Sequence, residues 1–167
     1  MTPFTSDLLL ILCRDLRCLA KEVGLYPDDA SLWRTLPGLA NSGGNVALHV
    51  AGNLRHFVGA TFGATGYVRQ REQEFAQREG RREEVMALLE ATILDVETGL
   101  RALTPEQLAA PFPAPLMGLH PPTSRVLLHL AAHLAFHLGQ VGYLRRALTG
   151  DATSGGGMAI QDLVVEG

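Results

Sequence analysis

Residues 127–146, LLHLAAHLAFHLGQVGYLRR, constrain the fold of this chain more than any other stretch. His129, His133 and His137 recur every four residues within an otherwise apolar helical pattern. Residues four apart on a helix lie about 40° apart around its axis and roughly 6 Å apart along it, so two adjacent imidazoles can bind one metal ion. A tightly held divalent ion normally has at least three protein ligands, so another segment must supply the third.

Composition excludes several classes of protein. The chain is 47% hydrophobic, which is typical of a globular protein with a core, and 167 residues suit a single domain spanning 1–167. With a net charge of −3 and interspersed acids and bases, we expect no nucleic-acid partner. The apolar run 8–13 is too short to span a bilayer and has no basic leader, so we expect no membrane association and a cytoplasmic protein. Cys13 and Cys18, five residues apart, are expected to be reduced structural thiols.

Hydrophobic periodicity predicts an all-α protein with four long amphipathic helices. The expected ranges are 6–24, 45–62 with Ser42 or Asn45 as cap, 81–104, and 123–148 with Gly150 as stop signal. Their long connections favour a four-helix bundle with at least one crossover.

The sequence also predicts the character of the segments between these helices and of the tail. Residues 26–44 form an ordered loop in which Trp33 packs into the core or closes a pocket. The charged run 69–79 is expected to be a solvated loop or surface segment, and the Pro-rich segment 111–122 stays out of helix. The tail, 151–167, is either docked or frayed.

The second predicted helix carries a line of polar residues on a face that otherwise looks core-facing. Asn45, His49, Asn53 and His56 fall on one strip at helical spacing, and buried polar groups are costly unless something satisfies them. If this helix packs beside the last one, His49 completes a metal-binding set with two histidines of that helix.

We expect the set to be His49, His133 and His137. His129 is then a neighbour of the site or a core residue. His56 lies about 10 Å from His49 along the helix, too far to share its ion, and His120 is expected to be exposed.

Three histidines leave at least one coordination position for water or substrate, as in catalytic rather than structural metal sites. Imidazole suits zinc, nickel, copper and iron alike. Asn53 and Gln140 are candidates for orienting a ligand or a metal-bound water, and Arg69 or Arg71 for meeting an anionic substrate.

The chain resembles the DinB-like superfamily of metal-binding four-helix bundles, most closely its DUF1572 branch. The matching motifs are NSGGN at 41–45, LHVAGNL at 48–54, RQREQEF at 69–75, HLAFHLGQ at 133–140 and YLR at 143–145. Gln70 departs from the Asp usual in that branch. The resemblance implies that His49, His133 and His137 form the metal triad, and it implies a homodimer.

The resemblance also implies candidate activities. Some relatives are metal-dependent transferases or isomerases that use low-molecular-weight thiols, the ion lowering the thiol pKa. We therefore expect a thiol S-transferase acting on small-molecule electrophiles with zinc, nickel or iron. Metal-assisted hydrolysis, a non-enzymatic metal or small-molecule binding module, and a bundle core without any ion are the alternatives.

Overall fold

The computed structural model describes residues 1–156 and 159–163, and within them all regular secondary structure is helical. The predicted all-α class is therefore confirmed. Four long helical stretches dominate: α1 (Pro3–Gly24), α3 (Gly43–Leu54) continued by the π-helical η1 (Arg55–Ala60) and by α4 (Thr61–Gly63), α6 (Arg82–Ala102) and α8 (Thr123–Thr149).

Capping residues set the ends of these helices. The Ser42 hydroxyl accepts from the Asn45 backbone N–H, and the Asn45 side chain accepts from the Ser42 N–H, so Ser42 is the cap of α3 and Asn45 lies inside it. The helix α1 begins at Pro3, earlier than periodicity indicated, because the Thr2 side chain caps it. Gly150 ends α8 in the left-handed region with a φ of 70°.

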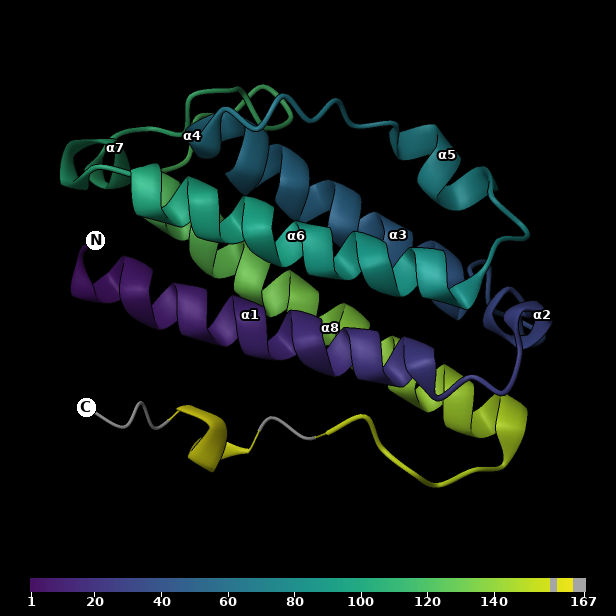
Figure 1. Cartoon of the computed structure of the whole chain (residues 1–167). Helices are drawn as coiled ribbons and strands as arrows, with labels where there is room; N and C mark the ends of the chain where they lie inside the picture. Colours follow the sequence, from purple (N-terminus) through teal and green to yellow (C-terminus); the bar gives the residue numbers. More distant parts are fainter. Residues whose placement is uncertain (157–158, 164–167) are drawn as a thin grey trace.

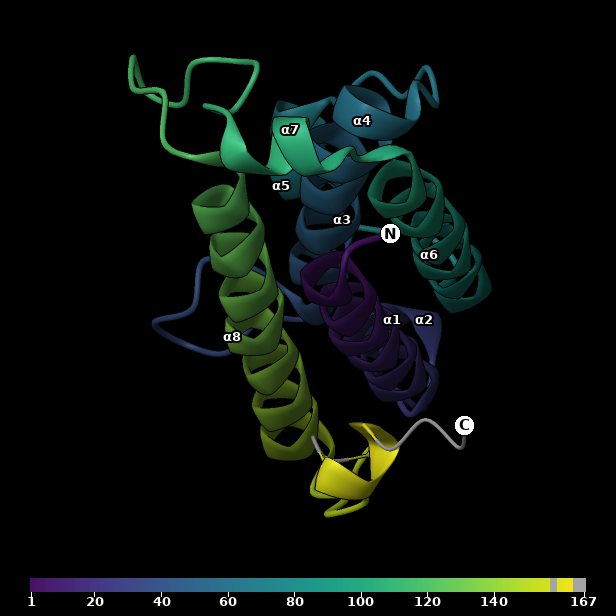
Figure 2. The ribbon, with the colours of Figure 1, turned by 90° about the vertical axis from the view of Figure 1, so that its left-hand side faces the viewer.

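The four stretches form a ring in which α1 and α3 each pack against both α6 and α8 (Figures 1 and 2). The helices α1 and α8 run in one direction, and α3 and α6 run in the other (Figure 1). Because α3 and α6 are parallel neighbours, the chain must return along the bundle between them. Residues 64–81 make this return, which is the crossover that the long connections predicted.

Three shorter helices lie where the sequence predicted loops or the end of a helix. The helix α2 (Asp29–Leu32) lies within the expected loop, and α5 (Arg71–Ala76) lies within the charged run. Thr104 and Pro105, expected only to end the third long helix, cap and open α7 (Pro105–Ala109). Trp33 is in the core, where its indole N–H donates to the Gly80 carbonyl at 2.8 Å.

The described part of the tail is docked. The backbone N–H of Gly155 donates to Glu22 Oε1 at 2.7 Å, and the 3-10 helix η2 (Ile160–Leu163) lies against α1. Residues 157–158 and 164–167, which the same expectation covered, lie outside the described residues.

Glu22 also anchors the end of α8. Its Oε2 accepts from Arg145 Nε at 2.8 Å, and the Arg145 side chain is fully buried. Burial raises the pKa of the Glu22 carboxyl, but the hydrogen bonds from Arg145 and Gly155 more than offset this, so that pKa lies below its ordinary value.

No helix among residues 1–156 and 159–163 is both long and apolar enough to cross a bilayer.

Substitution of Glu22 tests its role in anchoring the end of α8 through Arg145. Glu22→Gln removes the charge that balances Arg145, and we expect it to lower the free energy of unfolding by about 3 kcal/mol near neutral pH. Because the folded-state pKa is depressed, the stabilisation is fully present above the ordinary value of 4.5 and is lost as pH falls through the folded pKa.

Urea unfolding over a pH series measures the difference between wild type and variant. We expect that difference to shrink below pH 4.5. Glu90→Gln, at an exposed position of α6, is the matched control and should change stability little. A difference that grows toward acid pH would contradict the assignment.

Candidate metal centre

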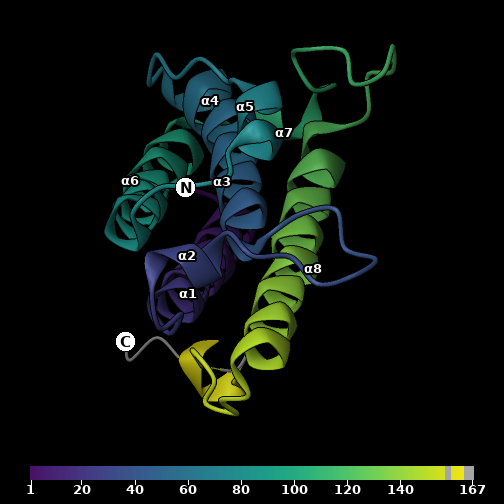
Figure 3. The same ribbon diagram turned by 90° about the vertical axis from the view of Figure 1, so that its right-hand side faces the viewer.

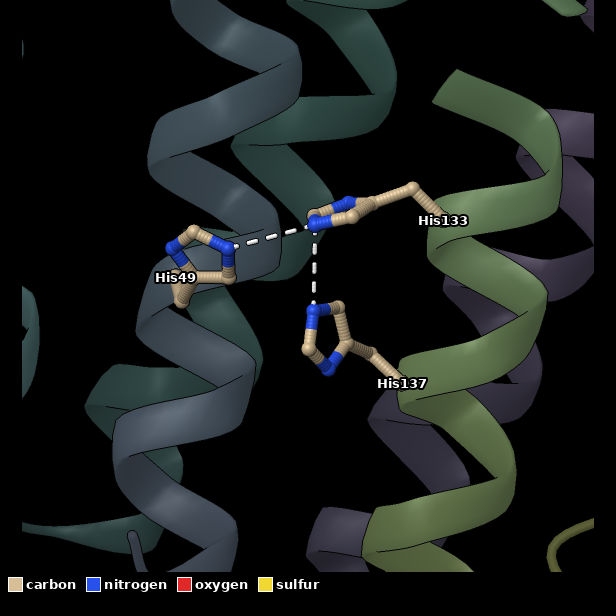
Figure 4. Close-up of side chains that lie close together, drawn as sticks. All are labelled: His49, His133 and His137. Atoms are coloured by element: carbon tan, nitrogen blue, oxygen red, sulfur yellow. Dashed lines mark hydrogen bonds between the residues drawn. The ribbon is translucent and has the colours of Figure 1, made fainter. Parts of the chain in front are cut away.

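Two antiparallel helices bring the three predicted histidines together. His49 projects from α3, and His133 and His137 project from α8, with their rings turned toward one another (Figure 4). The His133 Nε2 lies 3.3 Å from His49 Nε2 and 3.1 Å from His137 Nε2. Their potential ligand atoms all lie within 4.8 Å of one another, so these residues form a group that could hold a metal ion.

The outer nitrogens of two rings have acceptors that determine their tautomers. His49 Nδ1 lies 3.0 Å from Glu74 Oε2, and His137 Nδ1 lies 2.7 Å from Gln140 Oε1. A carboxylate oxygen and an amide oxygen can only accept, and these contacts place a hydrogen on both Nδ1 atoms. Arg69 Nη2 also lies 3.2 Å from His49 Nδ1, but its shorter contact, at 2.8 Å, is to Glu74 Oε2. In the neutral rings, both Nε2 atoms therefore present lone pairs to His133.

Hydrogen bonds within the cluster cannot satisfy all of these lone pairs. His133 Nε2 can donate at most one hydrogen, while it faces two acceptors. A divalent cation satisfies all three nitrogens at once. With zinc–nitrogen bonds of about 2.0–2.1 Å in tetrahedral geometry, neighbouring ligand nitrogens lie about 3.3 Å apart, close to the two separations from His133 Nε2. The residues present thus fit a divalent metal ion.

The surroundings of His133 and His137 favour their neutral forms, which ligation requires. Burial, with smaller effects from the neighbouring histidines and Arg69, lowers the pKa of His133 to about 4. Burial also lowers the pKa of His137, although its hydrogen bond to Gln140 opposes this shift.

Glu74 and Arg69 support His49 from the crossover, and the sequence analysis did not predict this. Arg69 donates from Nε and Nη2 to the two carboxylate oxygens of Glu74, at 2.7 and 2.8 Å. Burial raises the pKa of the Glu74 carboxyl, and the hydrogen bonds from Arg69 and His49 outweigh it, so that this pKa lies below its ordinary value. An ionised carboxylate behind a ligating histidine orients the ring and increases its basicity.

The expectation of a solvated charged run was therefore wrong at its centre. Glu74 is buried, and the Phe75 ring lies 4.8 Å from the His49 ring. Asn45 ties the segment to α3, because its side-chain amide donates to the carbonyls of Glu74 and Gln77. The one sequence signal was Phe75, the single large apolar residue of the run.

Gly52 makes room for this carboxylate. A Cβ at position 52 would overlap Glu74 Oε1, so only glycine lets Glu74 lie against α3.

The other residues considered in the sequence analysis lie at different distances from the three histidines and differ in burial. Gln140 contacts His137 as described, whereas Asn53 is buried with an Oδ1 that has no hydrogen-bond partner among the described residues. The ring of His129 is exposed and lies 5.9 Å from that of His133. His56 is half-buried against Phe57, outside the cluster, and His120 is exposed as expected.

A cavity of about 640 Å³ opens beside the histidines. His49 and His137 form part of its wall, and Val46 of α3, α5, the last turns of α8 and the connection between α2 and α3 supply the rest. Figure 3 shows that connection passing beside α8. Most of the wall is apolar, contributed by Leu36, Leu39, Ala40, Val46, Phe75, Val141, Leu144 and Ala147.

Comparison with known proteins agrees with this geometry. A family model described as the DinB superfamily matches residues 12–141, which include all three histidines. The chain belongs to the DinB superfamily. This superfamily is metal-binding, in keeping with the histidine group found here. No curated protein and no solved structure matches the chain.

Gly52→Ala tests the support that Glu74 gives to the DinB-superfamily histidines. The new methyl group displaces the carboxylate from His49, and we expect at least a tenfold loss of zinc affinity, the lower end of about 10–100-fold for such losses. Competition with a chromophoric chelator measures the dissociation constant.

Gly139→Ala on α8 is the matched control, because a Cβ there meets no atom within 4 Å. Equal zinc affinity of Gly52→Ala and wild type would show that the contact between Glu74 and His49 does not increase zinc affinity.

Proposed function

We propose that this protein is a metal-dependent enzyme that transfers a low-molecular-weight thiol to a small electrophile. In this proposal His49, His133 and His137 hold a divalent ion, with zinc, nickel and iron as candidates. The observation that carries it is the convergence of three Nε2 atoms at the wall of a substrate-sized cavity. The proposal includes membership of the DUF1572 branch, which the motifs quoted above support.

The ion would supply a positive charge that lowers the pKa of a thiol, so that thiolate is available at neutral pH. The residues of the chain contribute positioning. Glu74 and Gln140 hold the rings of His49 and His137 with their Nε2 atoms inward. The apolar wall excludes water from the thiolate and the electrophile.

The proposed reaction is a substitution without net oxidation or reduction. The thiolate sulfur forms a bond to an electrophilic carbon of the substrate, and the leaving group departs with the electron pair of the broken bond. The thiol proton passes to solvent.

The cavity favours this function over two of the three alternatives, the binding module and the hydrolase. A non-enzymatic module predicts a closed or filled coordination sphere, whereas His49 and His137 here line an open cavity. Hydrolysis needs a general base beside the ion, and no Asp or Glu of the described residues lines the cavity. The nearest carboxylate, Glu74, is engaged by Arg69 and His49.

Removal of a single imidazole tests the proposal. We expect untagged wild type to bind about one zinc per chain and to conjugate a low-molecular-weight thiol with 1-chloro-2,4-dinitrobenzene. His137→Ala should hold less than about 0.2 equivalents, because two imidazoles do not retain the ion tightly. Its conjugation rate should fall to the uncatalysed level.

Zinc content is measured by metal analysis. The conjugation rate is measured by chloride release, with a panel of cysteinyl-sugar and peptide thiols as donors. His120→Ala, at an exposed position in the Pro-rich connection, is the control and should match wild type. Full metal loading without conjugation of any thiol would support a binding module instead. Failure to bind zinc, nickel or iron would contradict the whole proposal.

The proposal includes a homodimer, supported by an unpartnered face of α8. Leu128, Phe136 and Tyr143 are exposed on this helix at spacings of eight and seven residues, which place them on one side. Exposed large apolar side chains on one side of a helix favour a protein interface, and a second copy of the chain supplies the same face for a two-fold contact.

Phe136→Glu should convert the dimer to a monomer, because two carboxylates would be buried at the contact. Light scattering after gel filtration measures the mass. Leu94→Glu on α6 is the matched control, since Leu94 and Phe136 are both 63% exposed. A monomeric wild type would refute the dimer and leave the metal centre unaffected.

A further inference from the structure

The cavity beside the histidines has few polar groups in its wall. Apart from the two histidines, Asn41, Arg71, Gln140 and Tyr143 are the only wall residues with polar side chains among the described residues. Arg71 is the sole ionised side chain among them at neutral pH. A ligand that fills this cavity therefore meets apolar surface and a single positive charge.

Arg71 and Arg69 have different partners in the structure, whereas the sequence did not distinguish between them. Arg69 is engaged with Glu74 and so supports His49. Arg71 has no ion pair or hydrogen bond within residues 1–156 and 159–163; its guanidinium instead lies 5.3 Å from the centre of the Phe75 ring. Stacking on Phe75 holds the charge at the cavity wall without neutralising it.

Gln140 adds hydrogen-bond donors to the same wall. Its Oε1 accepts from His137 Nδ1, so the amide NH₂ group has no acceptor among the described side chains. The polar groups that this amide and Arg71 can offer a ligand are therefore N–H donors, and the ligand group that suits them is an anionic oxygen acceptor.

The position of Arg71 also fits a ligand that spans the cavity. The Phe75 ring lies 4.8 Å from the His49 ring and 5.3 Å from the Arg71 guanidinium carbon, so the distance from Arg71 to His49 cannot exceed the sum of these two values. One small molecule can thus contact Arg71 at one end and reach the histidine cluster at the other.

We propose that the electrophilic substrate is an organic anion with an apolar body, whose carboxylate binds Arg71 while its other end faces the histidines. This inference rests on the proposed function, since it names the substrate class of the same cavity. The apolar body packs on Phe75, Val141 and Leu144, and the carboxylate stays at the exposed rim, where Arg71 is solvated and its binding costs little desolvation.

A matched pair of unreactive probes tests the substrate class: 4-phenylbutyrate and 4-phenylbutan-1-ol. Isothermal titration calorimetry is run on the full chain in metal-free and zinc-loaded forms. We expect metal-free wild type to bind the carboxylate about tenfold more tightly than the alcohol, as a charge-assisted contact predicts. Arg71→Gln should abolish this preference and leave the alcohol affinity unchanged.

Arg125→Gln is the matched control, because Arg125 is exposed in the first turn of α8 and does not line the cavity. A preference that survives Arg71→Gln, or that appears only in the zinc-loaded form, would show that the carboxylate binds elsewhere or on the ion. Absence of binding by both probes would overturn the proposal as well.

The two proposals fail in distinguishable ways. If the carboxylate preference depends on Arg71 but no thiol is conjugated, the anion site stands and thiol transfer is wrong. If thiols are conjugated but the preference is absent, the substrate class alone is wrong.

Discussion

Convergence of three imidazoles from two helices is the constraint on which the site depends. His49 and His137 both present Nε2 atoms to His133, whose Nε2 can donate to only one of them, and a divalent cation would satisfy all three nitrogens. This arrangement requires α3 and α8 to be antiparallel neighbours in one register. The ring of helices, in which α3 packs between α6 and α8, provides that placement.

The crossover supplies further contacts to the histidines of this helix pair. Its charged segment folds back onto α3, where Glu74 reaches the outer nitrogen of His49 and Arg69 compensates the buried carboxylate. The desolvation cost of Glu74 is offset only because these partners are in place. The carboxylate that contacts His49 thus comes from the connection that follows the α3–α4 stretch.

The cavity wall is built from different parts of the chain. The histidines come from α3 and α8, while α5 and the connection before α3 supply half of the other lining residues. Connections tolerate sequence change more readily than packed helices. Under the proposed function, substrate preference can therefore vary through residues such as Arg71 without disturbing the imidazoles.

The sequence by itself determined the helices and the identity of the clustered histidines. Apolar spacing and capping residues act locally, so the four long helical stretches and the polar strip of α3 were predictable. Only the tertiary structure decided that Glu74 is buried, that Arg69 and Arg71 have different partners, and that Gly52 must lack a side chain. Those outcomes depend on how residues 64–81 fold back against α3, a long-range contact that leaves no periodic signal in a short charged segment.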